Sequence, residues 1–500
     1  MGSKFTRRRL LAAMSAGATY LALTNTVGCE LLGGTSKDRP LPDVPSSRAQ
    51  TFRSRPDLDP PAVNVTTRAH DIAPGYIFVA TKMGGAGQGG PIILDDHGQV
   101  VWFRPVQDGS ARAIDFKVQY YRGRPVLTLQ EDEFGVLFDT SYREVARVRA
   151  GNGYRVDHHE FLITPQDTAL LTINDPVLVD LSPVGGPKNG VIRQGIVQEL
   201  DIETGEVLFE WHSLDHVGVD ETYIKQSQDH YLGIDYFHIN SIDVDHDENL
   251  LVSARNTSAV YKIDRQSGEV IWRLGGKKTD FEMGPGTRFS YQHDARRQPD
   301  DAITIFDNGT TVFDNNGIPR VVEESRSIVL KLDEEKMTAV LEREYTHPEQ
   351  QFAHAAGNMQ VLPNGNVFVG WGRALVFSEF SKSGELLFSA SFPPGFSPSD
   401  GSYRVFRFPW TGHPSDKPAV AAKRTSEDEV EVYASWNGAT EVTTWEVLVG
   451  PRPDQLESVG SVPRDGFETT MLVRTAEPYV GVRAKQRSGQ VLGSSEPAKL

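Results

Sequence analysis

The sequence predicts an all-β protein whose main body is a six-bladed β-propeller followed by a smaller β-sandwich. Three observations support this fold class: short apolar runs alternate with polar turns, one hairpin pattern recurs, and the pattern changes near the C-terminus. Glycine (46 residues) and proline (30 residues) are frequent and fall between the apolar runs, as turn-rich β structure requires. A chain of 500 residues also favours more than one domain.

Residues 1–29 predict an export signal. Lys4 and the run Arg7-Arg8-Arg9 precede an apolar stretch at residues 10–23, as in a twin-arginine signal. Cys29 is the only cysteine and follows small residues, which resembles a lipoprotein cleavage site. We therefore expect an exported protein of the cell envelope or extracellular space, with lipid on Cys29 as its one link to the membrane. A plainly cleaved signal or an uncleaved anchor is the alternative, although about 14 residues is short for a membrane span.

Residues 30–68 predict a flexible tether, because they are rich in proline, serine and arginine. From residue 69 to residue 414 the chain repeats a strand, a polar turn and a second strand. Five of these six hairpins have an aspartate at the turn, and the aspartates are separated by 44, 62, 63 and 69 positions. They are Asp95, Asp139, Asp201, Asp264 and Asp333, and the sixth hairpin covers residues 376–388. About 45 residues suffice for a four-stranded propeller blade, and the excess fits inserted loops.

Other apolar runs supply the inner strands of the expected blades. They lie at residues 75–80, 160–164, 249–253, 303–306 and 366–371. Closing the sheets into a ring removes most exposed strand edges, which keeps such a chain soluble. A β-helix or a pair of sandwiches is the competing architecture.

Residues 418–500 predict a separate domain. Strands are expected near residues 430–437, 444–449 and 479–484, with Trp436 at the end of an early strand and Tyr479 on a late one. This pattern resembles a fibronectin type III or immunoglobulin-like sandwich. Its expected role is structural or adhesive.

The charge balance excludes one class of partner. The formal net charge is −16, whereas a nucleic acid backbone requires a basic surface. A small anionic substrate is still compatible, because a local basic pocket can form on an acidic protein. A homodimer is also compatible with this sequence.

Several histidines occupy similar places, at or just before an expected inner strand. They are His158, His159, His238, His293 and His354, and Arg255 follows the strand after His238. The innermost strands of all propeller blades line one channel, so positions about 60 residues apart can converge. Imidazoles and a guanidinium that meet there form a positive, donor-rich pocket suited to a tetrahedral anion. The alternative is that each histidine only hydrogen-bonds a neighbouring blade.

A metal site is not expected. His158 and His159 are adjacent on a strand and point to opposite faces, so they cannot chelate one ion together with Glu160. Residues 243–249 resemble half of a calcium loop but lack its glycine and its terminal bidentate glutamate. That segment predicts a hairpin turn instead.

Specific motifs then give the chain a family resemblance, over about residues 70–400. It is similar to the arylsulfotransferase family of six-bladed propellers, in particular to the branch found in actinobacteria and fungi. The matching stretches are 74–79, Gly151-Asn152-Gly153-Tyr154, His159-Glu160-Phe161, Phe237-His238-Ile239-Asn240-Ser241, Trp272-Arg273-Leu274-Gly275-Gly276, Gln292-His293-Asp294 and Gly357-Asn358-Met359-Gln360-Val361.

The resemblance implies a transfer of a sulfuryl group from a phenolic sulfate ester to an acceptor phenol, independent of the nucleotide donor PAPS and of any cofactor. It implies that His293 is the nucleophile that becomes transiently sulfated. His159 and His238 match the oxygen-binding histidines, and Arg255, 17 residues after His238, matches the arginine. His354, His158, Asn240 and Asn358 are further candidates for substrate binding.

The chemistry agrees with this assignment, because a neutral imidazole is nucleophilic near its ordinary pKa of about 6.5. Phe161, Phe237, Tyr291 and Trp371 are candidates for an aromatic wall beside the substrate ring. The alternative function is a non-catalytic cell-surface protein that binds a glycan, a sulfated polymer or another protein. A quinone-dependent dehydrogenase is disfavoured, because the chain has only 7 tryptophans and no regular tryptophan repeat.

Overall fold

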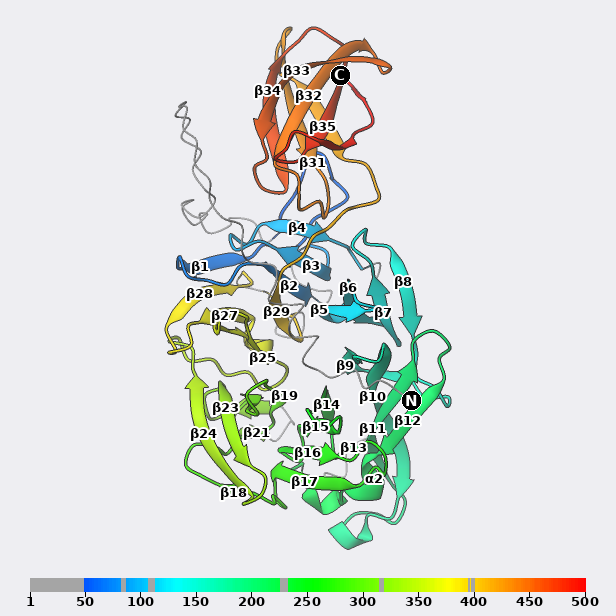
Figure 1. Cartoon of the computed structure of the whole chain (residues 1–500), viewed down its shortest axis with the longest axis vertical. Helices are drawn as coiled ribbons and strands as arrows, with labels where there is room; N and C mark the ends of the chain where they lie inside the picture. The colour runs from blue at the N-terminus through cyan, green and yellow to red at the C-terminus, as the bar shows by residue number, and fades with distance from the viewer. Residues whose placement is uncertain are drawn as a thin grey trace, which may run out of the picture. The chain divides into compact units, whose positions relative to one another are not determined.

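The computed structural model describes residues 49–81, 87–106, 113–224, 233–313, 319–393, 396 and 401–500. In this part of the chain nearly all regular structure is β-strand (Figure 1). The expected signal at residues 1–29, with Cys29, lies outside the described residues. Within the described ranges, no helix is both long enough and apolar enough to cross a membrane.

Six antiparallel sheets of four main strands follow one another along the chain. Sheet 1 contains β29 (Val405–Phe408), β2 (Tyr76–Thr81), β3 (Gly90–Leu94) and β4 (Val100–Phe103). Sheet 2 contains β5 (Ala113–Tyr121), β6 (Arg124–Glu131), β7 (Phe134–Phe138) and β8 (Glu144–Val148). Sheet 3 contains β9 (Val156–Ile163), β10 (Thr168–Val179), β11 (Gly190–Asp201) and β12 (Val207–His212), and β13 (Ile234–Asp235) pairs with β11.

The remaining three sheets repeat the arrangement. Sheet 4 contains β14 (Ile239–Val244), β15 (Leu250–Ala254), β16 (Ala259–Ile263) and β17 (Val270–Gly275). Sheet 5 contains β19 (His293–Arg297), β20 (Ile303–Asp307), β23 (Arg326–Asp333) and β24 (Thr338–Tyr345), with β18 (Glu282–Met283) on its outer edge. Sheet 6 contains β25 (Asn358–Val361), β26 (Val367–Gly370), β27 (Val376–Phe380) and β28 (Leu386–Ser391), with β1 (Asn64–Arg68) on its outer edge.

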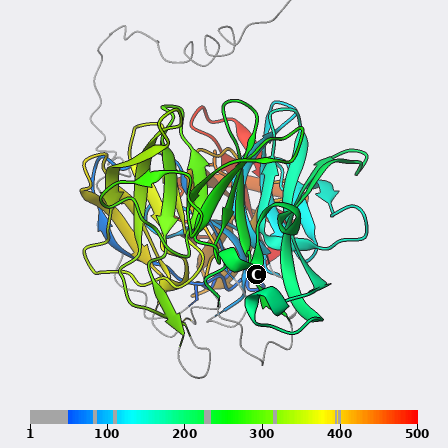
Figure 2. The ribbon, with the colours of Figure 1, turned by 90° about the horizontal axis from the view of Figure 1, so that it is seen from below.

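The hairpins predicted from the turn aspartates form the two outer strands of each sheet, for example β3 with β4 and β16 with β17. The innermost strand of each sheet contacts the innermost strand of the next, in the order β29, β5, β9, β14, β19, β25 and back to β29 (Figure 1). Figure 2 shows sheet 4 between its neighbours, sheet 3 in teal and sheet 5 in yellow-green. The ring is completed by β29, because this late strand pairs with β2 at the start of the chain.

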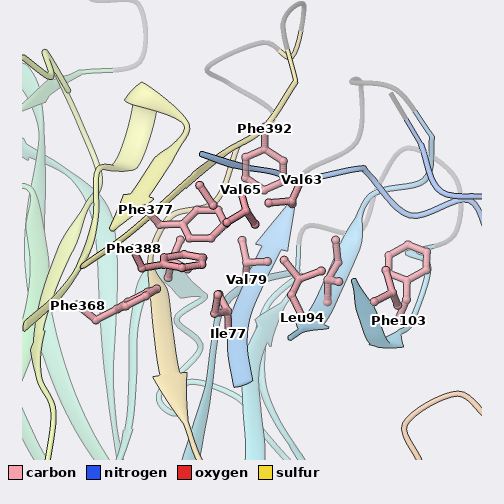
Figure 3. Packing of buried hydrophobic residues seen from close by; sticks show 14 of the residues in the cluster. Val63, Val65, Ile77, Val79, Leu94, Phe103, Phe368, Phe377, Phe388 and Phe392 are labelled. Carbon is pink, nitrogen blue, oxygen red and sulfur yellow. The ribbon is translucent and has the colours of Figure 1, made fainter. Parts of the chain in front are cut away.

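A cluster of buried apolar side chains joins the first and last sheets (Figure 3). Ile77, Val79 and Leu94 come from sheet 1, and Phe377 and Phe388 come from sheet 6. Burial of large aromatic and aliphatic side chains is the main favourable contribution to such an interface.

The same cluster corrects the boundary of the expected tether. Residues 30–68 were expected to be flexible, but Leu58, Val63 and Val65 are buried in the cluster and β1 pairs with β28. The prediction is therefore wrong for residues 49–68, where a few apolar side chains anchor an otherwise proline-rich and polar segment. Residues 30–48 lie outside the described residues.

Two further sheets follow residue 418 and enclose their own apolar core around Trp436 and Trp445. One contains β30 (Ala419–Arg424), β31 (Glu429–Ser435) and β34 (Glu468–Arg474); the other contains β33 (Gln455–Pro463), β32 (Thr444–Arg452), β35 (Tyr479–Lys485), β36 (Val491–Ser494) and β37 (Ala498–Lys499). The amide of Asn437 exchanges hydrogen bonds with the backbone of Phe103 in sheet 1, at 2.9 and 2.8 Å.

The other described elements are short. They are the hairpin of β21 (Thr311–Phe313) with β22 (Pro319–Val321), helix α2 (Ser213–His216), and the 3₁₀ turns η2 (Ser182–Val184), η3 (Val219–Glu221) and η4 (Gly372–Ala374).

Candidate active site

The innermost strands are irregular where the candidate residues lie. The pairing register shifts between Ile239 and Ser241 on β14, and between His293 and Arg296 on β19. His238, just before β14, and Asp294, within the shift on β19, both have positive φ angles of 55°. Bulges of this kind turn side chains away from the regular alternation of a strand and are frequent beside functional sites. Here they direct side chains from separate sheets toward one centre.

Three of the predicted histidines meet there. The ring centroids of His159 and His238 are 4.8 Å apart, and those of His238 and His293 are 6.5 Å apart, both in edge-to-face arrangements. The Tyr403 ring lies 5.5 Å from His159 and 6.1 Å from His293. These residues come from sheet 3, the start of sheet 4, sheet 5 and the segment before β29. The structure therefore brings together imidazoles that are far apart in sequence.

Two of these histidines have carboxylate partners. Nδ1 of His159 is hydrogen-bonded to Oδ2 of Asp157, and Nδ1 of His238 is hydrogen-bonded to Oδ2 of Asp235. Burial would raise the pKa of each aspartate, but the neighbouring histidines outweigh it and hold both pKa values below the ordinary value of 3.8. An ionised carboxylate on Nδ1 keeps a proton on that nitrogen and fixes the ring orientation. In both rings Nε2 is then the nitrogen left to face the centre.

His293 is held in a different way. Its side chain is buried, with 1% of its surface exposed, and its Nδ1 is 2.7 Å from Oδ1 of Asn308. Nδ2 of Asn308 donates to the carbonyl oxygens of Ala353 and Ala356, at 2.7 and 3.0 Å. Because the amide nitrogen is used in this way, its oxygen must accept, so Nδ1 of His293 carries the proton.

Nε2 of His293 therefore has a lone pair, which accepts a 3.2 Å hydrogen bond from the backbone N–H of Ala356. Burial, followed by the charges of Arg255 and His238, lowers the pKa of His293 well below its ordinary value of 6.5. The imidazole is thus neutral at neutral pH, the form that can act as a nucleophile.

Arg255 lies beside these rings. Its backbone N–H donates to the carbonyl of His238 at 2.9 Å, and its guanidinium lies 4.8 Å from the centre of the Tyr291 ring. Nη2 donates to the carbonyl of His354 at 2.9 Å. Nε is buried and has no hydrogen-bond partner among the described residues. A buried guanidinium with an unused donor is suited to an anion.

The remaining candidates have different surroundings. The side chain of His354 is half-buried, and burial together with the charges of Arg373 and Arg255 lowers its pKa. His158 is near enough to Asp157 to help lower the pKa of that aspartate. The amides of Asn240 and Asn358 bridge neighbouring inner strands.

Nδ2 of Asn240 donates to the carbonyl of Gln292 at 2.7 Å. Asn358 uses both amide atoms on the backbone of Val405, each at 2.9 Å. These contacts give both asparagines a part in joining sheets, and a direct role in substrate binding stays a prediction.

The expected aromatic wall is wrong for three of its four residues. Phe161, Phe237 and Trp371 are buried in separate hydrophobic clusters. Phe161 lies on β9, Phe237 just before β14 and Trp371 just after β26, and each cluster contains side chains from two neighbouring sheets. Tyr291 is the one of the four that borders Arg255.

A second group of buried charges lies next to the histidines. Arg404 pairs with Asp115 at 2.9 Å, Glu160 at 3.1 Å and Asp294 at 3.2 Å. Lys117 contacts both Asp115 and Glu160 at 2.7 Å, and Arg296 pairs with Glu160 and Asp294. Burial would raise the pKa of Glu160, but Arg296, Arg404 and Lys117 together lower it. The three acids and three bases cancel in charge and join four inner segments.

The chemistry of the centre follows from its donors. With their rings doubly protonated, His159 and His238 offer Nε2–H, together with Nε–H of Arg255, to the oxygens of a small anion, and neutral Nε2 of His293 can attack its central atom. Over the described ranges, no group of three His, Cys, Asp or Glu side chains is arranged to hold a metal ion.

The comparison with protein families agrees with this geometry. A family model described as Arylsulfotransferase (ASST) matches residues 117–393. The chain belongs to the arylsulfotransferase family. Membership implies arylsulfotransferase-type activity, with a phenolic sulfate as donor and a phenol as acceptor.

Solved structures similar to this arylsulfotransferase family member are distant in sequence. A protein of unknown function from Bacteroides caccae is 14% identical and covers 67% of this chain and 98% of its own, with a TM-score of 0.36. Virginiamycin B lyase from Staphylococcus aureus is 9% identical over 75% of this chain and 96% of its own, with a TM-score of 0.32. The WD40 domain of Neurospora crassa Pan2 is 11% identical and covers 79% of this chain and 94% of its own, with a TM-score of 0.35. No curated protein sequence matches the chain.

Sequence reasoning missed several residues of the candidate site. Asp157 and Asp235 had a local signal, since each precedes its histidine by two or three positions. Asn308, Tyr403 and Arg404 had none, because only the folded topology brings Asn308 and Tyr403 to His293 and Arg404 to the neighbouring Asp294.

Proposed function

We propose that this protein transfers a sulfuryl group from a phenolic sulfate to an acceptor phenol through a sulfated His293, without PAPS. The observation that carries the proposal is the meeting of His159, His238 and His293 beside Arg255, with His293 neutral and the other two rings held by carboxylates. The family assignment supports the same reaction class.

In the first step, Nε2 of His293 attacks the sulfur of the donor. The N–S bond forms as the S–O bond to the aryl group breaks, and the aryl oxygen leaves with the electron pair. The ring of His159 or of His238 starts doubly protonated, with Nδ1–H on Asp157 or Asp235. It gives its Nε2 proton to this phenolate and becomes neutral, while Nδ1–H stays on the carboxylate. Nε–H of Arg255 donates to one of the equatorial oxygens, where one preorganised donor is worth roughly 3–4 kcal/mol.

In the second step, the acceptor phenol gives its proton back to the same imidazole. Its oxygen attacks sulfur, the N–S bond breaks, and neutral His293 is regenerated. The hydrogen bond from the Ala356 N–H occupies the lone pair of Nε2 at 3.2 Å, so binding of the donor must displace this long contact. The released N–H then becomes one more donor beside the reacting group.

The wider organisation is part of the proposal. We propose that the six sheets are the blades of one six-bladed propeller, and the closed order of contacts among the inner strands supports this. We also propose that residues 418–500 form a fibronectin type III-like sandwich, and that the protein is exported and carries lipid on Cys29. The sequence of residues 1–29 supports export.

The test uses the purified protein with 4-nitrophenyl sulfate, with and without phenol. Release of 4-nitrophenol should depend on the phenol, show ping-pong kinetics, and fall to background in His293→Ala. Mass spectrometry of a donor-only reaction should find one added sulfuryl group on the peptide that contains His293. A folded protein that turns over none of several donor and acceptor pairs would favour the binding protein instead, and a fully active His293→Ala would reject the nucleophile.

A further inference from the structure

A cavity of about 240 Å³ lies next to the candidate active site. Its lining includes the aromatic side chains of Tyr223, Phe289 and Tyr291. Tyr291 belongs to both places, because its ring also lies 4.8 Å from the guanidinium of Arg255. Ser258, which follows Arg255 by three positions, lines the cavity as well, and its hydroxyl accepts the backbone N–H of Tyr291 at 3.2 Å. The cavity is thus linked to Arg255 through Tyr291, which contacts both.

One polar atom of the lining points to a ligand. Oγ1 of Thr311 is buried and has no hydrogen-bond partner among the described residues, and the whole residue is 5% exposed. Buried hydroxyl groups normally have a partner. A ligand oxygen in the cavity would supply one.

A second cavity, of about 700 Å³, adjoins the first, and together the two are called the groove below. Both are lined by Met283, Arg288, Phe289, Ser290 and Thr310. Pockets for drug-sized ligands are roughly 300–1,000 Å³, so the two adjoining cavities exceed the needs of a single aromatic ring. Met283 is half-buried and stands at their junction.

We propose that this groove is the aryl-binding subsite of the enzyme, and that it favours phenols of two or more fused rings over phenol itself. The inference rests on the proposed function. In a ping-pong reaction the aryl group of the donor leaves before the acceptor binds, so one subsite serves both. The phenolic oxygen lies at the end bordered by Tyr291, whose ring contacts Arg255, and a ring oxygen or carbonyl farther along the ligand bonds to Thr311.

The experiment measures binding apart from catalysis. The fluorescent phenol 4-methylumbelliferone is titrated into wild-type protein and into His293→Ala, and both should bind it. Met283→Trp fills the junction and should weaken binding at least tenfold, while Tyr223→Ala and Thr311→Val should weaken it about threefold to tenfold. Val361→Trp is the matched control, because it adds the same side chain beside a different cavity, and it should bind like the wild type.

Turnover separates the two proposals. With 4-methylumbelliferyl sulfate as donor, the same three variants should raise KM and leave kcat nearly unchanged, and phenol should be the poorer acceptor. Normal turnover with unchanged KM in all three variants overturns the subsite and leaves the proposed function standing. Binding that Met283→Trp abolishes in a protein without transfer activity supports the subsite and contradicts the enzyme. Equal loss of binding in Val361→Trp also overturns the subsite.

Discussion

Oδ1 of Asn308 accepts a hydrogen bond from Nδ1–H of His293 at 2.7 Å, and this contact decides which nitrogen of the imidazole is left to react. The amide cannot rotate to offer its nitrogen instead, because that nitrogen already donates to the carbonyls of Ala353 and Ala356. A neutral ring in a single tautomer is prepared for attack from Nε2.

Replacing Asn308 with leucine should therefore lower kcat by at least about tenfold, because an imidazole in the wrong tautomer can cost up to roughly 10⁴-fold. Asn308→Asp is the informative partner, since it keeps an acceptor for Nδ1 and adds a negative charge. That charge favours the protonated ring, so the acidic limb of the kcat profile should move to higher pH. The pH–rate profiles of both variants with 4-nitrophenyl sulfate check this, and an unmoved limb in Asn308→Asp would contradict it.

Asp157 and Asp235, which are hydrogen-bonded to Nδ1 of His159 and of His238, should stabilise the transition state. Asp157→Asn or Asp235→Asn removes the negative charge that balances the doubly protonated ring, so the ring loses the positive charge with which its Nε2–H stabilises the transition state. The weakened donor should reduce kcat by about 10²–10³-fold with a smaller effect on KM. Asp201→Asn, on an exposed turn far from the histidines in sequence, is the control and should keep wild-type kcat. Unchanged kinetics in both Asp157→Asn and Asp235→Asn would contradict the role given to these two aspartates.

Much of this fold could be predicted from the chain, and the reasons are local. The turn residues Asp95, Asp139 and Asp264 stabilise their loops with their own side chains, as in the contacts from Asp139 to Ser141 and from Asp264 to Ser267. Such turns depend on neighbours in sequence, so the outer hairpins could be predicted from the sequence alone. The pairing of β29 with β2 joins residues over 300 positions apart, and no local pattern marks it.

The same difference between local and long-range contacts decided which residues of the candidate site could be predicted. His159, His238 and His293 were found because each lies at or just before the innermost strand of a repeated sheet, and Arg255 was assigned its role through the family resemblance. Arg404 was missed because it precedes the closing strand, and its partners Asp115, Glu160 and Asp294 come from three different sheets. The aromatic wall failed for the converse reason, since Phe161 and Phe237 lie near His159 and His238 in sequence but pack in clusters between neighbouring sheets.

Arg404 should be important for stability. Its side chain is fully buried, and Arg404→Met leaves Asp115, Glu160 and Asp294 with too few positive partners. Breaking a buried ion pair on one side typically costs about 3–5 kcal/mol. Lys278→Met is the matched control, because Lys278 pairs with Asp220 at the surface with 49% of its side chain exposed, where solvent screening leaves about 0–1 kcal/mol. Urea unfolding of both variants checks the prediction, and equal midpoints would contradict it.

Asp243 should make stability depend on pH in the direction opposite to most carboxylates. Burial, only partly offset by Arg296, raises its pKa from 3.8 to about 6, although its Oδ2 accepts the backbone N–H of Arg297 at 2.7 Å. The folded protein therefore holds the proton more tightly than the unfolded chain. Its contribution to stability is lost as pH rises from about 4 through 6.

Asp243→Asn removes this titration and keeps an oxygen for the Arg297 N–H. The variant should match the wild type near pH 4 and be more stable at pH 8 by about 2–3 kcal/mol, since one pKa unit corresponds to about 1.4 kcal/mol. Asp201→Asn should show the opposite sign, because hydrogen bonds from Thr204 lower the pKa of Asp201 and stabilise its charged form. Urea unfolding of all three proteins at the two pH values makes the comparison. A stability difference between Asp243→Asn and the wild type that is the same at both pH values would show that Asp243 does not titrate in this window.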